Sequence, residues 1–250
     1  MSILENKIRV GAFTSSEIHR LMSNNKQGTA FGAPGISYIA EKNLERKLGR
    51  SLDLGKGSNA TLWGQFLEQR VHDLMPVGYE LMSKVTMPHP EYKDIWVGSQ
   101  DNVVREESCV CDTKCYEPQK FAEYNDALIK AKATGDLSEW KKDYAKEYWQ
   151  LISNACIWGF KYIEVILYMP YESELVEIKQ AAIDYEDTDQ WKYRFIYETD
   201  NSGLAYLPDG NAYYKNLNVY RFEAPEADKE ALKERVLLAA KELIPVQVNL

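Results

Sequence analysis

Two charged side chains interrupt a segment that otherwise has the composition of a buried strand. In the stretch VCDTKC, Asp112 and Lys114 alternate with Cys111, Thr113 and Cys115. Side chains two residues apart on a strand point to the same face, so Asp112 and Lys114 stand side by side and the other three face the opposite way. An unmatched charge there would be costly. The pair is therefore either a structural salt bridge or part of a site.

Two further carboxylates are expected near this pair. Asp101 follows the turn VGSQ at the end of one expected strand, so a hairpin would bring it to Asp112 and Lys114 on the next. Glu68 belongs to the preceding expected helix, where WGQFLEQ could point it at the same end of the sheet. Three carboxylates and a lysine have the composition of a Mg²⁺ site that cuts phosphodiesters. Hard oxygen ligands hold a metal with open positions for water and phosphate, and lysine adds a compact cation.

Hydrophobic spacing and turn residues predict the elements that must position these groups. A short helix is expected to begin near Ser15 or Ser16. Four further helices are expected over residues 35–49, 59–75, 140–159 and 226–243. A meander of three strands is expected between residues 78 and 115, and a further strand over 161–170. The Tyr-rich stretch at 203–222 is expected to be irregular. The order helix, three strands, helix, strand predicts an α/β protein.

Apolar residues at helical spacing support two of these helices. On the helix at 35–49 they are Ile36, Ile39, Leu44 and Leu48. On the helix at 140–159 they are Tyr148, Leu151, Ile152, Ala155 and Cys156, which form its apolar face.

Composition limits the class of protein. With 250 residues, 45% of them hydrophobic and 27% charged, the chain can bury one substantial core, and a single domain over residues 1–250 is expected. The net charge of −8 argues against a protein that coats nucleic acid nonspecifically, although basic residues could still line one channel. No long apolar run and no secretory start are present, so we expect no membrane association and a cytoplasmic location. The four cysteines are expected to be reduced thiols.

Several segments together resemble one family of nucleases. Asp101, ten intervening residues and then Asp112-Thr113-Lys114 resemble the PD-(D/E)xK nuclease signature. IRVGAFTSSEIHRLM is similar to the R-x-G-x-x-T-A-S-E segment of the lambda-type phage recombination exonucleases, the YqaJ-like viral recombinase family. SYIAEKNLERKLG and LWGQFLEQ resemble that family's next two helices, SQDNVV its S-P-D-G turn and CDTKC its E-x-K-C strand. YWQLISNACIWGFKYIEVILYMP resembles its helix and strand with a Q-x-Q motif, so the resemblance covers about residues 8 to 170.

The resemblance implies a fold. It implies a restriction-endonuclease-like core, in which a central mixed sheet is flanked by helices, with a helical N-terminal part and a C-terminal helix. Residues 171–250 would be an extension of unknown role. The tyrosines of this extension could stack on bases, but a packing role is favoured because few lysines or arginines lie between them.

The resemblance also assigns metal ligands and a catalytic lysine. It makes Asp101 and Asp112 ligands, with the Thr113 carbonyl as a third. Lys114 would orient or activate the attacking water, and Glu68 would support a second metal.

Four polar residues would act on the substrate by the same resemblance. Gln150 would place the nucleophile or the scissile phosphate. Arg9 and Ser16 would bind the terminal 5′-phosphate, a role that suits guanidinium geometry and a helix N-terminus. Ser99 is a weaker phosphate candidate. From the residues alone, Arg9 could equally be a surface arginine, Ser16 a helix cap and Gln150 a helix-surface amide.

The function implied is DNA end resection. The resemblance implies a Mg²⁺-dependent exonuclease, with Mn²⁺ as a second candidate metal. It would degrade one strand of double-stranded DNA ends from 5′ to 3′ for phage-type recombination. A ring-like homotrimer, a single-strand annealing protein as partner, and a phage or prophage gene in a bacterial host are further implications. Two alternatives stay open, namely a metal-dependent endonuclease with the same core and a catalytically impaired DNA-end-binding protein.

The sequence departs from the family pattern at several positions. Gln100 and Asn102 replace the Pro and Gly of the turn, Asp112 replaces Glu, and Ile152 replaces the second glutamine. The family's upstream tryptophan segment is also absent, so the pocket for the DNA end is expected to differ.

Two groups of potential metal ligands have a simpler interpretation. The clustered thiols of Cys109, Cys111 and Cys115 could hold an iron–sulfur cluster or zinc, but small buried side chains are favoured because they lie on the strand of Asp112. His72 follows Glu68 by one helical turn, which suits a ligand pair, although a structural histidine is favoured.

Overall fold

Two sheets form the centre of the molecule. The computed structural model describes residues 8–28, 30–52, 57–82, 85–185 and 190–245. The larger sheet contains five strands in the order β2 (Glu80–Leu81), β5 (Asn102–Val104), β6 (Cys109–Lys114), β7 (Tyr162–Tyr168) and β8 (Leu217–Glu223). It is mixed, because β6 and β7 run parallel and the other pairs are antiparallel. The smaller sheet contains β1 (Phe13–Thr14), β4 (Trp96–Gly98) and β3 (Met87–Pro88).

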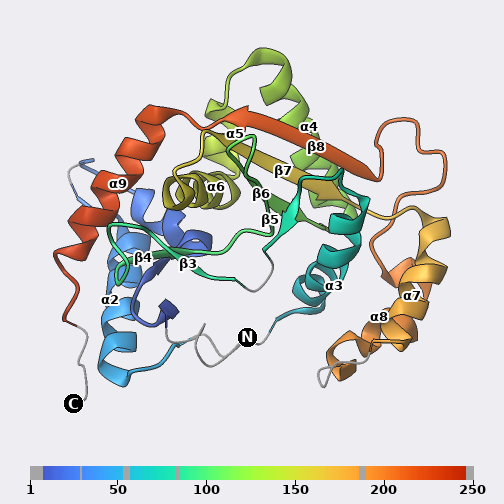
Figure 1. The fold of residues 1–250 in the computed structure, drawn as a ribbon, viewed down its shortest axis with the longest axis horizontal. Coiled ribbons are helices and arrows are strands. Elements are labelled where there is room, and N and C mark those ends of the chain that lie inside the picture. Colours follow the sequence, from blue (N-terminus) through green and yellow to red (C-terminus); the bar gives the residue numbers. More distant parts are fainter. Residues whose placement is uncertain (1–7, 29, 53–56, 83–84, 186–189, 246–250) are drawn as a thin grey trace.

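Helices cover both faces of the larger sheet (Figure 1). One face carries the 3₁₀ helix η1 (Ser15–Met22) with α4 (Pro118–Thr134), α5 (Ser138–Asp143), α6 (Ala145–Trp158) and α9 (Glu226–Ala240). The other face carries α3 (Asn59–Leu74), α7 (Leu175–Ile183) and α8 (Arg194–Glu198). The helix α2 (Ala33–Leu48) packs against η1. This arrangement confirms the α/β fold with a mixed sheet flanked by helices.

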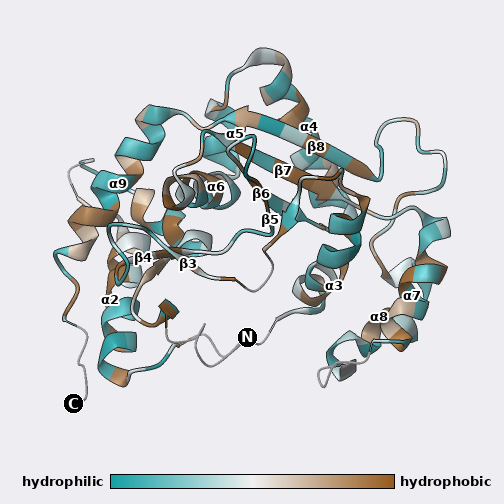
Figure 2. Ribbon diagram, viewed as in Figure 1, coloured by the Kyte–Doolittle hydropathy of each residue, from teal (hydrophilic) through white to brown (hydrophobic). Residues whose placement is uncertain are grey.

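The strand β6 is buried on both faces, as expected for a strand between two helical layers. Val110 joins the hydrophobic core under α6, whereas Cys109 and Cys111 join the core under α3. Figure 2 shows hydrophobic residues along the central strands β6 and β7. The alternation continues through the strand and directs Asp112 and Lys114 to the α6 side.

Most predicted elements are present. The helices expected over 35–49, 59–75 and 226–243 are α2, α3 and α9, and the strand expected over 161–170 is β7. The helix expected over 140–159 is divided into α5 and α6 at Tyr144, whose backbone leaves the helical region. The predicted faces of α6 are correct, with Leu151, Ile152 and Ala155 fully buried.

The prediction of one three-stranded meander was wrong. Residues 78–115 form five short strands divided between the two sheets. The chain leaves the smaller sheet after Gly98 and enters the larger sheet at Asn102. As a result, β4 pairs with β1 and β3, whereas β5 pairs with β2 and β6. The hairpin of β5 and β6, which carries Asp101 and Asp112, is present as predicted.

Among the elements of the described residues that were not predicted are the helix α4 and the strand β8. The helix α4 has the expected signals, with Pro118 in its first turn and Gly135 in the left-handed conformation after its last. The strand β8 lies in the Tyr-rich stretch expected to be irregular and pairs with β7 over its whole length, from Tyr162 opposite Glu223 to Tyr168 opposite Leu217. Residues beyond 170 thus supply an edge strand of the larger sheet.

The set of four apolar residues at helical spacing on α2 does not mark its buried face. Three of its four residues are exposed, namely Ile36, Leu44 and Leu48. The buried face includes polar side chains that bind the N-terminal segment: Glu45 Oε2 accepts from Gly11 N at 2.9 Å, and Arg46 Nε donates to Gly11 O at 2.8 Å. Polar contacts of this kind leave no trace in hydrophobic periodicity.

Gly98, the last residue of β4, packs closely against α6 and η1. A Cβ atom there would lie 2.3 Å from Asn154 Oδ1, 2.3 Å from Ser15 Oγ and 2.7 Å from a methyl group of Ile157. We therefore expect Gly98→Ala to destabilise the fold by about 1–3 kcal/mol, which calorimetric unfolding would detect as a lower Tm. As a matched control, Gly64→Ala on α3 meets no atom within 4 Å and is expected to leave Tm unchanged or raise it. A Tm for Gly98→Ala at or above the wild-type value would contradict this packing.

None of the helices in the described part of the chain is long and apolar enough to cross a membrane.

Candidate active site

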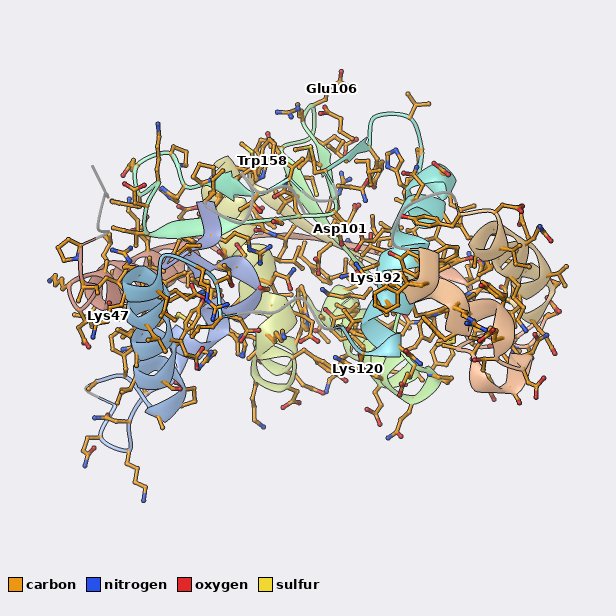
Figure 3. The ribbon with its side chains drawn as sticks, turned by 90° about the horizontal axis from the view of Figure 1, so that it is seen from below. Lys47, Asp101, Glu106, Lys120, Trp158 and Lys192 are labelled. Atoms are coloured by element: carbon orange, nitrogen blue, oxygen red, sulfur yellow. The ribbon has the colours of Figure 1, made fainter. Side chains whose placement is uncertain are left out.

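The hairpin of β5 and β6 brings two carboxylates together. Asn102 lies opposite Cys111 in antiparallel register, so the preceding Asp101 lies across from the following Asp112. Asp101 N donates to Cys111 O at 3.2 Å, and Thr113 N donates to Asp101 Oδ2 at 2.6 Å. Asp112 is only 2% exposed. Figure 3 shows Asp101 between the α2 side and the α3 side of the molecule.

Lys114 is ion-paired with Asp112 inside this site. Its Nζ lies 2.5 Å from Asp112 Oδ2, and both side chains are largely buried. Burial alone would lower the pKa of Lys114, but the charges of Asp112 and Asp101 outweigh it and raise the pKa above its ordinary value. The lysine is therefore a fixed positive charge. The prediction that Asp112 and Lys114 lie side by side is confirmed.

Negative charge is concentrated around Asp101. Burial raises the pKa of Asp101 well above its ordinary value, and repulsion from Asp112 and Glu68 raises it further, against the opposing effects of Lys114 and the Thr113 N–H. Burial, Glu68 and Asp101 likewise raise the pKa of the Cys115 thiol. Glu68 is thus close enough to act electrostatically on this site, which places all three predicted carboxylates in one region.

The donor set suits a hard divalent cation. Asp112 Oδ2 faces Lys114 Nζ but is otherwise buried without a hydrogen-bond donor, and a cation would relieve the repulsion at Asp101. Carboxylate and main-chain carbonyl oxygens are the ligands that Mg²⁺ prefers. As they stand, no three His, Cys, Asp or Glu side chains among the described residues are close enough together to hold a metal. Two carboxylates and one main-chain oxygen would instead hold the cation, namely those of Asp101, Asp112 and the Thr113 carbonyl. Glu68 would approach the cation from α3.

Two side chains of α6 bind or face these groups. Gln150 Nε2 donates to Asp112 Oδ1 at 2.9 Å, so both carboxylate oxygens of Asp112 have a partner. Glu147, one turn earlier, is buried, and its charge contributes to the raised pKa of Lys114. It accepts hydrogen bonds from Tyr116 Oη at 2.7 Å and Lys120 Nζ at 2.9 Å. Sequence reasoning missed Glu147, although its spacing of three residues from Gln150 places both on one helix face.

Replacement of Gln150 tests whether this hydrogen bond matters. For a nuclease of the kind that the sequence resembles, Gln150→Leu is expected to lower DNA cleavage by about 10–100-fold, because Asp112 loses the donor that fixes its orientation. The rate of cleavage under single-turnover conditions is the measurement, with circular dichroism to verify folding. Ile152 stands where the resembled Q-x-Q motif has its second glutamine. Its side chain is fully buried in the hydrophobic core. A wild-type rate in Gln150→Leu would reduce Gln150 to a helix-surface amide.

The predicted phosphate-binding residues lie on neighbouring segments. Ser16 Oγ lies 3.4 Å from Thr14 Oγ1 near the start of η1. Ser99 Oγ lies 3.0 Å from Thr86 Oγ1, two residues before Asp101. Arg9 has a helical backbone and lies shortly before β1. In the described residues no hydrogen bond or ion pair joins Arg9, Ser16 or Ser99 to the carboxylates, so their roles stay predictions.

The α3 side of the site contains an unusual group of buried polar side chains. Gln100 is almost completely buried, and neither of its amide atoms has a hydrogen-bond partner. Thr113 Oγ1 and Asn102 Nδ2 are also buried without a partner. Asn102 Oδ1 lies 2.7 Å from Nδ1 of His72 on α3. Gln100 and Asn102 are the two positions where the sequence departs from the family's turn.

The cysteines are all free thiols. Cys109 and Cys111 are buried in the core under α3. No third ligand accompanies them in a metal-binding group within the described ranges. Their surroundings favour the interpretation as small buried side chains.

Comparisons with known proteins identify the fold. No protein-family model matches the sequence, and a search of curated proteins finds no match. Among solved structures, an alkaline exonuclease (LHK-Exo) from Laribacter hongkongensis aligns with a TM-score of 0.60 at 15% identity, over 96% of this chain and 92% of that chain. The same enzyme in complex with dAMP aligns with a TM-score of 0.59, also at 15% identity and the same coverage. A phage-related exonuclease from Haemophilus somnus 129PT aligns with a TM-score of 0.61 at 14% identity, over 92% of each chain. The chain therefore shares the fold of these exonuclease structures.

Proposed function

We propose that this chain, which has the fold of phage exonucleases, is a Mg²⁺-dependent deoxyribonuclease that degrades one strand of double-stranded DNA from an end. One observation carries the proposal. Asp101 and Asp112 lie opposite each other on a hairpin, with Lys114 Nζ 2.5 Å from one oxygen of Asp112 and Gln150 Nε2 2.9 Å from the other. The proposal is supported by the alignment with exonuclease structures over more than nine tenths of this chain.

Each residue of the site has a distinct role in this proposal. Asp101, Asp112 and the Thr113 carbonyl would hold the cation, and Glu68 would support a second one. A divalent cation bound there would supply Lewis acidity toward the phosphate and lower the pKa of bound water.

The remaining side chains orient the attacking water and the metal ligands, and they offset negative charge on the phosphate. Lys114 keeps its charge next to Asp112, so it can orient the attacking water and offset charge that develops on the phosphate. Gln150 holds Asp112 in place through Oδ1. Glu147 faces Lys114 from α6 and favours its charged form.

The finer points of the proposal concern ends and products. We infer 5′ to 3′ degradation, with Arg9 and Ser16 at the terminal 5′-phosphate and Ser99 as a further phosphate contact. The complex of LHK-Exo with dAMP supports a deoxynucleoside monophosphate as the released product. A role in phage-type recombination inside a bacterial host, a homotrimer around DNA and a single-strand annealing partner complete the proposal, and Mn²⁺ is a second candidate metal.

The choice of DNA substrate tests this function. Linear duplex DNA and covalently closed circular DNA are incubated with the protein and Mg²⁺. In a second comparison, linear DNA with 5′-phosphate ends is set against linear DNA with 5′-hydroxyl ends. The proposal predicts loss of linear DNA only, with faster loss of phosphorylated ends and a slower rate for Arg9→Ala. Cleavage of the closed circle would indicate the endonuclease with the same core. Tight cation binding without cleavage of any DNA would indicate a DNA-end-binding protein.

A further inference from the structure

One partly buried hydrogen bond joins the helix of Glu68 to the strand that follows Asp101. His72 Nδ1 lies 2.7 Å from Asn102 Oδ1. Because an amide oxygen can only accept, His72 Nδ1 carries the proton and donates. Asn102 directly follows Asp101, and its register partner Cys111 directly precedes Asp112. His72 lies one helical turn after Glu68, so both side chains project from the same side of α3.

Most other contacts of α3 with the sheet are apolar, apart from Arg70 Nε, which donates to Tyr168 Oη of β7 at 3.1 Å. Trp63, Leu67 and Val71 are buried in the core that contains Cys111. Hydrophobic contacts are non-directional, so they hold the helix against the sheet without fixing its rotation or its position along the strand. A partly buried hydrogen bond is directional and fixes both. The pair of His72 and Asn102 joins α3 to β5 next to Asp101, whereas Arg70 joins the same helix to β7.

The side chain of Asn102 carries a free-energy cost, because burial leaves one of its polar atoms without a hydrogen-bond partner. Asn102 is completely buried, and its Nδ2 has no acceptor. Glycine, which the resembled turn has at this position, would leave no buried amide to satisfy. Four of the buried polar atoms without a partner belong to Gln100, Asn102 and Thr113, which flank the two carboxylates. Unsatisfied groups of this kind are tolerated where a site requires them.

We propose that His72 and Asn102 are positioning residues that lock α3 onto β5 and thereby hold Glu68 at the cation site formed by Asp101 and Asp112. This inference rests on the proposed function and adds two residues to it. Neither side chain touches the substrate or the reacting atoms. Their removal is expected to weaken cation binding rather than the chemistry of a fully loaded site.

Cation affinity tests the proposal independently of activity. Isothermal titration calorimetry with Mn²⁺ is performed on the full chain of wild type, His72→Phe, Asn102→Gly and the double variant, and Tm is measured without metal. Each single substitution is expected to weaken Mn²⁺ binding by about tenfold. The double variant is expected to be no weaker than the weaker single variant, because both substitutions remove the same hydrogen bond. At saturating Mn²⁺ the single-turnover cleavage rate should return to within about twofold of wild type.

Two further variants separate positioning from general stability. His72→Asn keeps a donor at the branch where Nδ1 stands, and it should recover most of the lost affinity. Gln69→Ala removes a hydrogen bond of similar length on the exposed side of the same helix, from Gln69 Nε2 to Asp73 Oδ1 at 2.8 Å, and should leave affinity unchanged.

The outcomes distinguish this inference from the proposed function. Unchanged Mn²⁺ affinity in His72→Phe and Asn102→Gly, with or without a lower Tm, would overturn the inference while an active wild type upholds the nuclease. A wild type that binds no Mn²⁺ and cleaves no DNA would overturn both. Weaker binding in the single variants, recovered in His72→Asn, would support the inference.

Discussion

Lys114→Ala is expected to lower DNA cleavage by about 10²–10³-fold, the cost of removing one charge that stabilises a transition state. Lys114 Nζ lies 2.5 Å from Asp112 Oδ2, and the nearby carboxylates raise its pKa, so it is protonated at neutral pH. Without this ammonium, nothing at that position would offset charge on the phosphate or orient water. Single-turnover cleavage of linear duplex DNA at saturating Mg²⁺ is the measurement.

Two companion variants isolate the charge of Lys114. Lys114→Met keeps most of the side-chain volume and should lose as much activity as Lys114→Ala. Both should also lower Tm in the absence of metal, because Asp112 is left buried without its ion-pair partner. Lys161→Ala serves as the control, since Lys161 is exposed and pairs only with the surface residue Glu223 among the described acids. Full activity in Lys114→Met would remove Lys114 from the mechanism.

Asp101→Asn is expected to abolish cation-dependent cleavage and at the same time raise the stability of the metal-free protein. Burial and repulsion from Asp112 and Glu68 raise the pKa of Asp101 well above its ordinary value. An ionised Asp101 therefore destabilises the fold at neutral pH, above its unfolded pKa, and this cost is relieved as the pH falls and the carboxyl is protonated. Asparagine removes the charge at all pH values, and its oxygen can still accept from Thr113 N. We expect Tm to rise by about 2–4 °C for each kcal/mol gained.

Asp112→Asn provides the matched comparison. It should also abolish cleavage, but it removes the ion pair that holds Lys114 and leaves a buried ammonium without its carboxylate. Tm should therefore fall, in the opposite direction from Asp101→Asn. Thermal unfolding in the presence of EDTA at neutral pH measures both changes. A lower Tm for Asp101→Asn would contradict the charge repulsion inferred at this site.

The centre of the site could be predicted from the sequence because it depends on local geometry. The two-residue period of a strand places Asp112 beside Lys114, and a short hairpin sets Asp101 across from Asp112. Gln150 was placed by the resemblance, and its hydrogen bond to Asp112 agrees with a position at the site. The relationships among Asp101, Asp112 and Lys114 need only β5 and β6, which are next to each other in the chain.

The parts that could not be predicted depend on polar contacts between distant segments. Glu147 is stabilised by Tyr116 and Lys120, about thirty positions away, and looks like an ordinary surface acid in the sequence. The buried face of α2 contains charged residues that bind the backbone near Gly11, so hydrophobic spacing does not mark that face. His72 and Asn102 belong to different elements, and only their packing reveals the pair.

The most direct test of the central claim is the release of nucleotides from linear duplex DNA labelled at the 5′ or the 3′ end. Wild type and Lys114→Met are compared in Mg²⁺ and in EDTA. The account predicts that wild type releases labelled mononucleotide from the 5′ end in Mg²⁺ alone, and that neither EDTA nor the variant permits release. Release that persists in EDTA, or that is equal in Lys114→Met, would contradict a metal site at Asp101 and Asp112 with Lys114 beside it.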